Sequence, residues 1–138
     1  MNSYNHDDVW QAPSCNTPLN ATVNIPGSKS LSNRYLILAA LGSKPVVLKG
    51  LLRSRDTELM INALSVFGVK CDLLSRDGTT VCVIPPKNGV FSVDDCAVVN
   101  CGLAGTVMRF VTALALFANN CVKFDGDEQA YALSLIHI

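Results

Sequence analysis

The sequence echoes itself at an offset of 75 residues, and this repeat limits the folds that the chain can adopt. The matched positions are Gly27 and Gly102, Arg34 and Arg109, Tyr35 and Phe110, Ala40-Leu41 and Ala115-Leu116, and Val47 and Val122. A period of this length exceeds that of the common solenoids, so each copy is expected to be a supersecondary unit within a larger assembly. The alternative is a chance match, because apolar helices resemble one another.

The first copy carries signals for a series of elements in the order β-α-β-α-β-β, beginning with a strand and a helix. Alternating residues predict a strand at 21–25, which Pro26-Gly27 breaks. A helix is expected over 30–41, opened by serines and closed by Gly42. Its apolar positions at helical spacing are Leu31, Tyr35 and Leu38.

The rest of the first copy reads as a strand, a second helix and a hairpin. A strand is expected at 46–48, and Asp56 is expected to cap a helix that ends at Gly68. The apolar face of this helix comprises Met60, Leu64 and Phe67. Two β-rich segments, 69–74 and 79–84, flank Ser-Arg-Asp-Gly, which is a hairpin signal.

The pattern begins again after the loop that follows residue 84, and it predicts a mixed α/β (α+β) fold built from repeated β-α-β-α-β-β units. Unit one covers about 21–84, and unit two, about 96–132, stops where its second helix is expected. A polar leader, 1–20, precedes them, and an atypical tail, 133–138, follows. The chain is therefore expected to be incomplete.

Composition disfavours several classes of function. Basic and acidic residues number eleven each, so the chain lacks the summed positive field that draws nucleic acids and membrane surfaces. The leader has neither the basic start nor the apolar run of a secretory signal, and no stretch reaches the length of a membrane span. These features predict a cytoplasmic globular protein with no nucleic-acid or membrane partner.

Cysteine and histidine placement predicts neither a metal site nor disulfides. The six cysteines form no C-x-x-C pair, and both histidines lie near the termini. Most of the cysteines, including Cys82 and Cys121, lie among apolar neighbours, where a reduced thiol is expected to be buried. A reducing cytoplasm fits this pattern.

Residues 26–34, Pro-Gly-Ser-Lys-Ser-Leu-Ser-Asn-Arg, form the more informative of two candidate anion sites. Free N–H groups and the dipole at a helix start favour an anion, and Lys29, Ser30 and Arg34 add a charge, a hydroxyl and a guanidinium fork on one face. A P-loop is not expected, because the upstream glycine of that motif is missing. The alternative is a capped surface helix with solvated charges.

The second candidate site is the equivalent segment of unit two. Gly105 and Thr106 open a helix there, and Arg109 follows one turn later. Glycine allows a ligand to approach the backbone closely, so two such helix starts would suit a ligand set with more than one negative group. A structural ion pair is the alternative for Arg109. The acidic residues near expected helix starts read as caps, and spacing alone identifies no catalytic base.

The residues just described resemble the signatures of the 5-enolpyruvylshikimate-3-phosphate synthase family. Four motifs occur in the family's order, covering about 9–132: PGSKSLSNRYLILAAL, LLRSRDTELMINAL, GLAGTVMRF and FDGDEQAYA. The Trp10-x-x-Pro13 start and the Gly-Leu-Ala-Gly form of the third motif are most similar to actinobacterial members. The chain thus resembles the N-terminal part of such an enzyme.

The resemblance implies a two-domain enzyme, monomeric at full length, in which each domain holds three such units as an inside-out α/β barrel. The 5-hydroxyl of shikimate 3-phosphate attacks C2 of phosphoenolpyruvate in the cleft, and phosphate leaves. By matched position, Lys29 touches both substrates, Ser30 and Arg34 hold shikimate 3-phosphate, and Gly105, with Thr106 beside it, meets phosphoenolpyruvate. No metal or organic cofactor is implied. Glyphosate binds in the family's phosphoenolpyruvate pocket.

Two departures from the family pattern bear on activity. Many relatives have Asn where Leu103 stands, and the arginine expected after Ala-Tyr-Ala is replaced by the tail 133–138. The acid/base groups are expected in the missing part, so this chain is expected to be inactive alone. Two alternatives remain: a relative acting on UDP-N-acetylglucosamine, whose opening motif resembles Gly-Gly-Lys-Asn-Ala more than Gly-Ser-Lys-Ser, and a non-catalytic phosphate-binding fragment.

Overall fold

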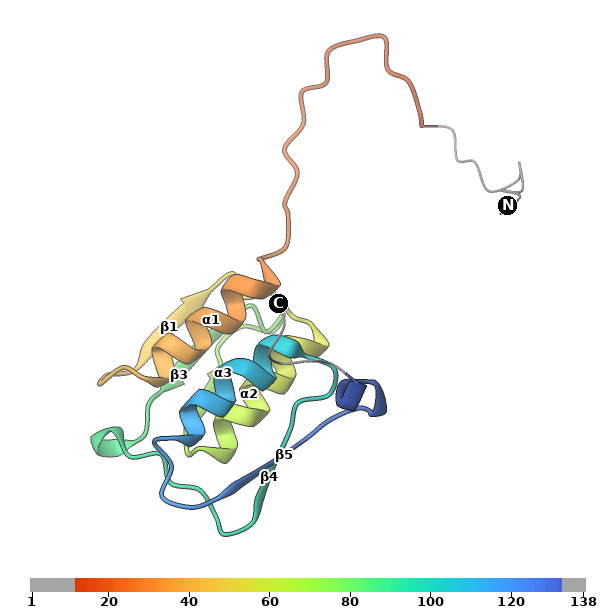
Figure 1. The fold of residues 1–138 in the computed structure, drawn as a ribbon. Coiled ribbons are helices and arrows are strands. Elements are labelled where there is room, and N and C mark those ends of the chain that lie inside the picture. Colours follow the sequence, from red (N-terminus) through yellow and green to blue (C-terminus); the bar gives the residue numbers. More distant parts are fainter. Residues whose placement is uncertain (1–11, 133–138) are drawn as a thin grey trace, which may run out of the picture.

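A computed structural model describes residues 12–132, which fold as a mixed α/β body with three clustered helices (Figure 1). The helices are α1 (Lys29–Ala40), α2 (Arg55–Val66) and α3 (Gly105–Ala115). The strands are β1 (Val46–Lys49), β2 (Lys70–Leu73), β3 (Thr80–Ile84), β4 (Ala97–Asn100) and β5 (Val122–Asp125). Two short 3₁₀ helices lie at Lys87–Gly89 and Glu128–Ala132.

The helices lie inside and the strands outside. The three helices contact one another, α1 packs on β1 and β3, α2 on β2 and β4, and α3 on β5. One sheet is antiparallel with the order β1-β3-β2, and β4 pairs with β5 in parallel. This agrees with the expected inside-out arrangement, although the described part of the chain closes no barrel.

Helix α1 forms as expected, but the prediction of its buried face is wrong. Ser28 caps it by accepting a hydrogen bond from the Leu31 amide, 3.4 Å away. The residues that pack inward are Ser32, Asn33, Leu36, Ala39 and Ala40. The predicted stripe of Leu31, Tyr35 and Leu38 is 53%, 53% and 62% exposed. Because α1 carries apolar residues around most of its circumference, spacing alone does not identify the inward side.

Helix α2 is the centre of the core. Its predicted apolar residues Met60, Leu64 and Phe67 are fully buried, and the Phe67 ring meets Phe91 edge to face at 6.3 Å. Gly68, with a φ of 77°, ends the helix as predicted. Asp56, however, is not the cap. Ser54 occupies that position in a capping box with Thr57.

The hairpin is confirmed, whereas the strand expected at 21–25 is absent from the structure. β2 and β3 pair in the expected antiparallel register around the Ser-Arg-Asp-Gly turn. Residues 12–25 instead run as an extended segment away from the body (Figure 1), where Val23 and Ile25 are 77% and 84% exposed. A strand needs a hydrogen-bonding neighbour, and the described residues provide none for this segment.

The structure supports the 75-residue echo. Helix α3 lies at that offset from α1, and β5 lies within one residue of that offset from β1. In the second copy, the counterpart of residues 22–25 does form a strand, β4, because β5 is available to pair with it. The same sequence position therefore forms a strand only where it has a partner.

The two copies also share a close backbone crossing made possible by glycine. A side chain on Gly27 would overlap the carbonyl oxygen of Gly50, where the chain leaves β1. In the second copy, a side chain on Gly126 would overlap the carbonyl oxygen of Gly102. Each copy thus brings the segment before its helix against the end of the strand that follows it.

All six cysteines are free, but they differ in environment. Only Cys101 is buried, and Cys121, expected to be buried, is exposed because it lies in the turn before β5. Burial, with the charge of Asp72, raises the pKa of the Cys71 thiol to about 11. Hydrogen bonding from the Thr17 side chain lowers the pKa of the exposed Cys15 thiol.

This contrast predicts different rates of alkylation. In the folded protein at pH 8, Cys71 should react with iodoacetamide at least about tenfold more slowly than Cys15, because far less of its thiol is ionised. Peptide mass spectrometry of timed samples measures both rates, and urea should bring them together. Equal rates in the folded protein would contradict the described environments.

Candidate anion-binding site

The helix starts singled out in the sequence lie side by side. The Asn33 side-chain nitrogen, in the first turns of α1, donates to Thr106 Oγ1 of α3 at 2.8 Å. One residue further along α1, the Arg34 guanidinium lies over the Phe110 ring of α3, 5.7 Å from its centroid. The structure therefore brings the two candidate sites of the two copies next to each other.

Lys29 and Asp56 form an ion pair between the first turns of α1 and α2. The Lys29 ammonium lies 2.8 Å from the Asp56 carboxylate, and the two side chains are 55% and 25% exposed. An exposed pair of this kind contributes little to stability. Asp56 therefore positions the Lys29 ammonium at the surface, where an anion can reach it. Sequence reasoning had assigned Asp56 only to capping.

Arg34 and Ser30 lie on one face of α1, as predicted. The Arg34 guanidinium donates to the Ser30 hydroxyl and to its carbonyl oxygen, the latter at 3.3 Å. Arg34 is exposed, and Ser30 is half-buried. Together with Lys29 they place two cations and a hydroxyl within two turns of a helix start.

The start of α3 lacks a side-chain cap. Ala104 occupies the cap position and has no polar side chain to accept from the first-turn N–H groups. A methyl group on Gly105 would lie 3.3 Å from an Arg109 guanidinium nitrogen, so Arg109 folds back over the helix start. Among the residues described, Arg109 makes no ion pair, which leaves its charge available to a ligand.

Sequence reasoning missed the buried polar residues that hold these helix starts. The Ser32 hydroxyl accepts from the Leu52 amide at 2.9 Å, and Thr57 Oγ1 donates to the Leu52 carbonyl at 2.7 Å. This network ties α1 to the start of α2, while Asn33 ties it to α3. Polar residues at inward helix positions were the available signal, but their partners depend on tertiary packing.

Three further hydrogen bonds hold the fourth motif. The Arg55 guanidinium donates to Asp127 at 2.9 Å, linking α2 to the segment after β5. Asp125 accepts from the Gly126 amide and from the Tyr131 hydroxyl, and the hydrogen bond from Tyr131 lowers the pKa of this carboxyl. The acidic residues read as caps thus anchor a turn in the structure.

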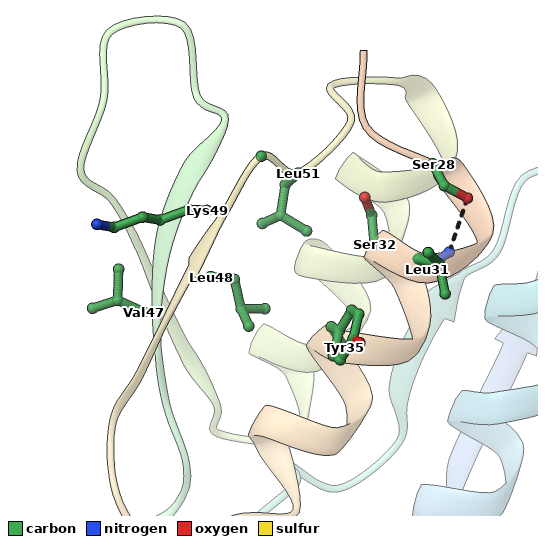
Figure 2. A pocket seen from close by; sticks show the side chains of 9 residues that line it. Ser28, Leu31, Ser32, Tyr35, Val47, Leu48, Lys49 and Leu51 are labelled. Atoms are coloured by element: carbon green, nitrogen blue, oxygen red, sulfur yellow. Dashed lines mark hydrogen bonds between the residues drawn. The ribbon is translucent and has the colours of Figure 1, made fainter. Parts of the chain in front are cut away.

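A groove between α1 and β1 contains neither Lys29 nor Arg34. It has a volume of about 360 Å³. Figure 2 shows Tyr35, Leu48 and Leu51 around it, while the Lys49 side chain projects away. Its apolar lining suits side-chain packing better than a small anion.

The described residues contain neither a cluster able to hold a metal ion nor a helix long and apolar enough to cross a membrane. Repeated α/β units with helices inside, strands outside and two cationic helix starts in contact define a mixed α/β class of protein. A family model described as EPSP synthase (3-phosphoshikimate 1-carboxyvinyltransferase) matches residues 14–132. The chain belongs to the EPSP synthase family, which confirms the resemblance seen in its motifs.

Individual relatives agree with this assignment. The chain is 66% identical over 125 residues to the 3-phosphoshikimate 1-carboxyvinyltransferase of Bifidobacterium longum, covering 91% of this chain and 28% of the relative. An EPSP synthase structure from Acinetobacter baumannii shares the fold with a TM-score of 0.70 at 19% identity, over 82% of this chain and 25% of that one. The chain thus spans about a quarter of the length of these relatives.

Proposed function

We propose that this chain forms the N-terminal part of a longer enzyme, the full-length protein, that transfers the enolpyruvyl group of phosphoenolpyruvate to the 5-hydroxyl of shikimate 3-phosphate. Phosphate is the second product, and the reaction lies on the shikimate pathway. The observation that carries the proposal is the contact between the two cationic helix starts, joined by Asn33 and Thr106. Membership of the EPSP synthase family supports it.

The proposed roles follow from charge and position. Lys29 contacts both substrates, and Ser30 and Arg34 hold shikimate 3-phosphate. Gly105 presents its backbone to phosphoenolpyruvate, with Thr106 beside it. The ammonium, the guanidinium and the helix N–H groups stabilise negative charge on the substrates and on the tetrahedral adduct that forms when the 5-hydroxyl attacks C2.

The remaining catalytic work falls to residues outside this chain. The hydroxyl proton must leave and the methylene carbon must be protonated when the adduct forms. Phosphate must then depart while the new methyl group loses a proton, which restores the enol double bond. None of the five residues above is proposed as the general acid or base. We place the full-length protein in the cytoplasm as a monomer.

The test is substrate-dependent phosphate release by the full-length protein. Phosphate should appear from phosphoenolpyruvate only when shikimate 3-phosphate is present, and UDP-N-acetylglucosamine should not replace it. Turnover with the nucleotide sugar would assign the enzyme to the related transferase. Tight binding of both substrates without phosphate release would favour a non-catalytic binding role.

Gly105→Ala tests the phosphoenolpyruvate pocket. A methyl group at position 105 would project beside the α3 amides, so we expect the KM for phosphoenolpyruvate to rise about tenfold and glyphosate inhibition to weaken. The KM for shikimate 3-phosphate should stay nearly unchanged. The fold should tolerate the change, since the nearest atom is in the flexible Arg109 side chain and alanine favours helix.

Kinetics and thermal melting of this variant distinguish a ligand-binding role of Gly105 from a packing role. A lowered melting temperature with an equal rise in KM for both substrates would show that this glycine only permits packing.

A further inference from the structure

Asn33 is a buried amide with one half unpaired. The residue is fully buried, and its side-chain nitrogen donates to Thr106 Oγ1 at 2.8 Å. Among residues 12–132, its side-chain oxygen finds no hydrogen-bond partner. Buried amides normally satisfy both halves, so a retained half-satisfied amide needs an explanation beyond stability.

The bond from Asn33 determines what the Thr106 hydroxyl can do. An oxygen that accepts a hydrogen bond from Asn33 directs its own proton elsewhere. The described residues offer that proton no acceptor, and Thr106 is half-buried beside Gly105 at the start of α3. The Thr106 hydroxyl is therefore held as a donor at the proposed phosphoenolpyruvate site, which suits an anionic ligand.

Asn33 also belongs to a rigid connection among three helix starts. Its neighbour Ser32 binds the Leu52 amide before α2, and Lys29 pairs with Asp56 in the first turn of α2. Asn33 supplies the corresponding tie from α1 to α3. The relative placement of the two anion-binding helix starts thus depends on the first turns of α1.

We propose that Asn33 is a positioning residue that makes the Thr106 hydroxyl a hydrogen-bond donor to phosphoenolpyruvate. This inference rests on the proposed function. Asn33 touches neither substrate and acts through Thr106. The direction of the hydrogen bond is essential. If the Thr106 hydroxyl donated to Asn33, its proton would not be available to phosphoenolpyruvate.

Asn33→Asp in the full-length protein tests the direction. A carboxylate only accepts, so it would capture the Thr106 proton, and the KM for phosphoenolpyruvate should rise at least about tenfold at pH 8. The KM for shikimate 3-phosphate should stay within about twofold. As the pH falls, a protonated carboxyl can donate again, so the deficit relative to the parent should shrink. A merely structural role would not produce this pH dependence.

Thr106→Val and Thr106→Ser provide a second measurement that leaves Asn33 itself unchanged, although valine removes the acceptor of its side-chain nitrogen. Valine should reproduce the loss of phosphoenolpyruvate affinity, and serine should retain most of the parent's. Valine should cost little more when Asn33→Asp is already present, because the hydroxyl is then already lost as a donor. Melting temperatures identify variants that fail to fold.

The outcomes separate the two proposals. A parent that does not turn over phosphoenolpyruvate with shikimate 3-phosphate would overturn the proposed function and, with it, this role of Asn33. An active parent whose Thr106→Val variant keeps its KM for phosphoenolpyruvate within twofold would overturn the role of Asn33 alone. If Asn33→Asp raised the KM for both substrates equally and the deficit did not shrink as the pH falls, Asn33 would have only a packing role.

Discussion

Replacing Lys29 by alanine in the full-length protein should lower kcat/KM by about 100-fold or more, equivalent to about 3 kcal/mol of transition-state stabilisation. The substrate anions of the proposed reaction would lose a charged partner. Stability should change little, because the Lys29–Asp56 pair is exposed. Lys29→Arg should also lower kcat/KM, since a planar guanidinium does not reproduce a compact ammonium shared by two ligands.

Arg34→Ala should have a comparable effect, because it removes a guanidinium that contacts with Ser30 and Phe110 hold in place. Lys44→Ala is the matched control, since Lys44 is an exposed cation in the turn after α1. Steady-state kinetics with both substrates and melting curves measure the outcome. Kinetic constants within a factor of two of the parent for either Lys29→Ala or Arg34→Ala would refute the assignment.

Phe67→Ala should reduce the free energy of unfolding by about 3–5 kcal/mol, a large share of the total for a protein of this kind. Phe67 is fully buried at the end of α2 and meets Phe91 edge to face. Its removal would leave a cavity between the first unit and the segment that leads into the second.

The control for Phe67→Ala is Phe117→Ala, which removes the same side chain from a position that is 63% exposed. Urea unfolding should show a lower midpoint for the Phe67 variant and nearly the parent midpoint for the control. A change below about 1 kcal/mol at Phe67 would show that the site collapses around the missing ring, contrary to the described packing.

The sequence predicted correctly those helix and hairpin ends that are marked by capping or turn residues. Serines before α1, glycine after α2 and the Ser-Arg-Asp-Gly turn each act over a few residues, so the sequence records them directly. The prediction of a strand at 21–25 was wrong. Alternating polar and apolar residues indicate which side chains would face the core, but they do not show whether a neighbouring strand is available for hydrogen bonding. The prediction of the buried face of α1 was wrong because this helix has apolar residues on two faces, and only one of them packs inward.

The candidate site divides in the same way. Lys29, Ser30, Arg34, Gly105 and Thr106 follow from helix-start chemistry together with the family motifs. Asn33 and Ser32 could not be assigned, because a buried polar side chain acquires its role from residues far away in the sequence. Thr106 lies 73 positions from Asn33, and only the packed structure shows that the two meet.

The matching glycine crossings have a consequence for the ancestry of the molecule. Gly27 and Gly50 in one copy, and Gly102 and Gly126 in the other, preserve one path of the backbone while most side chains around them differ. If that path predates the duplication, the two helix starts descend from a single ancestral one. In that case, the helix start of the first copy acquired Lys29 and Ser30, whereas the helix start of the second copy has Gly105, which exposes its backbone amide. On that premise, the shared backbone path at these glycines, and not the surrounding side chains, reflects the common origin.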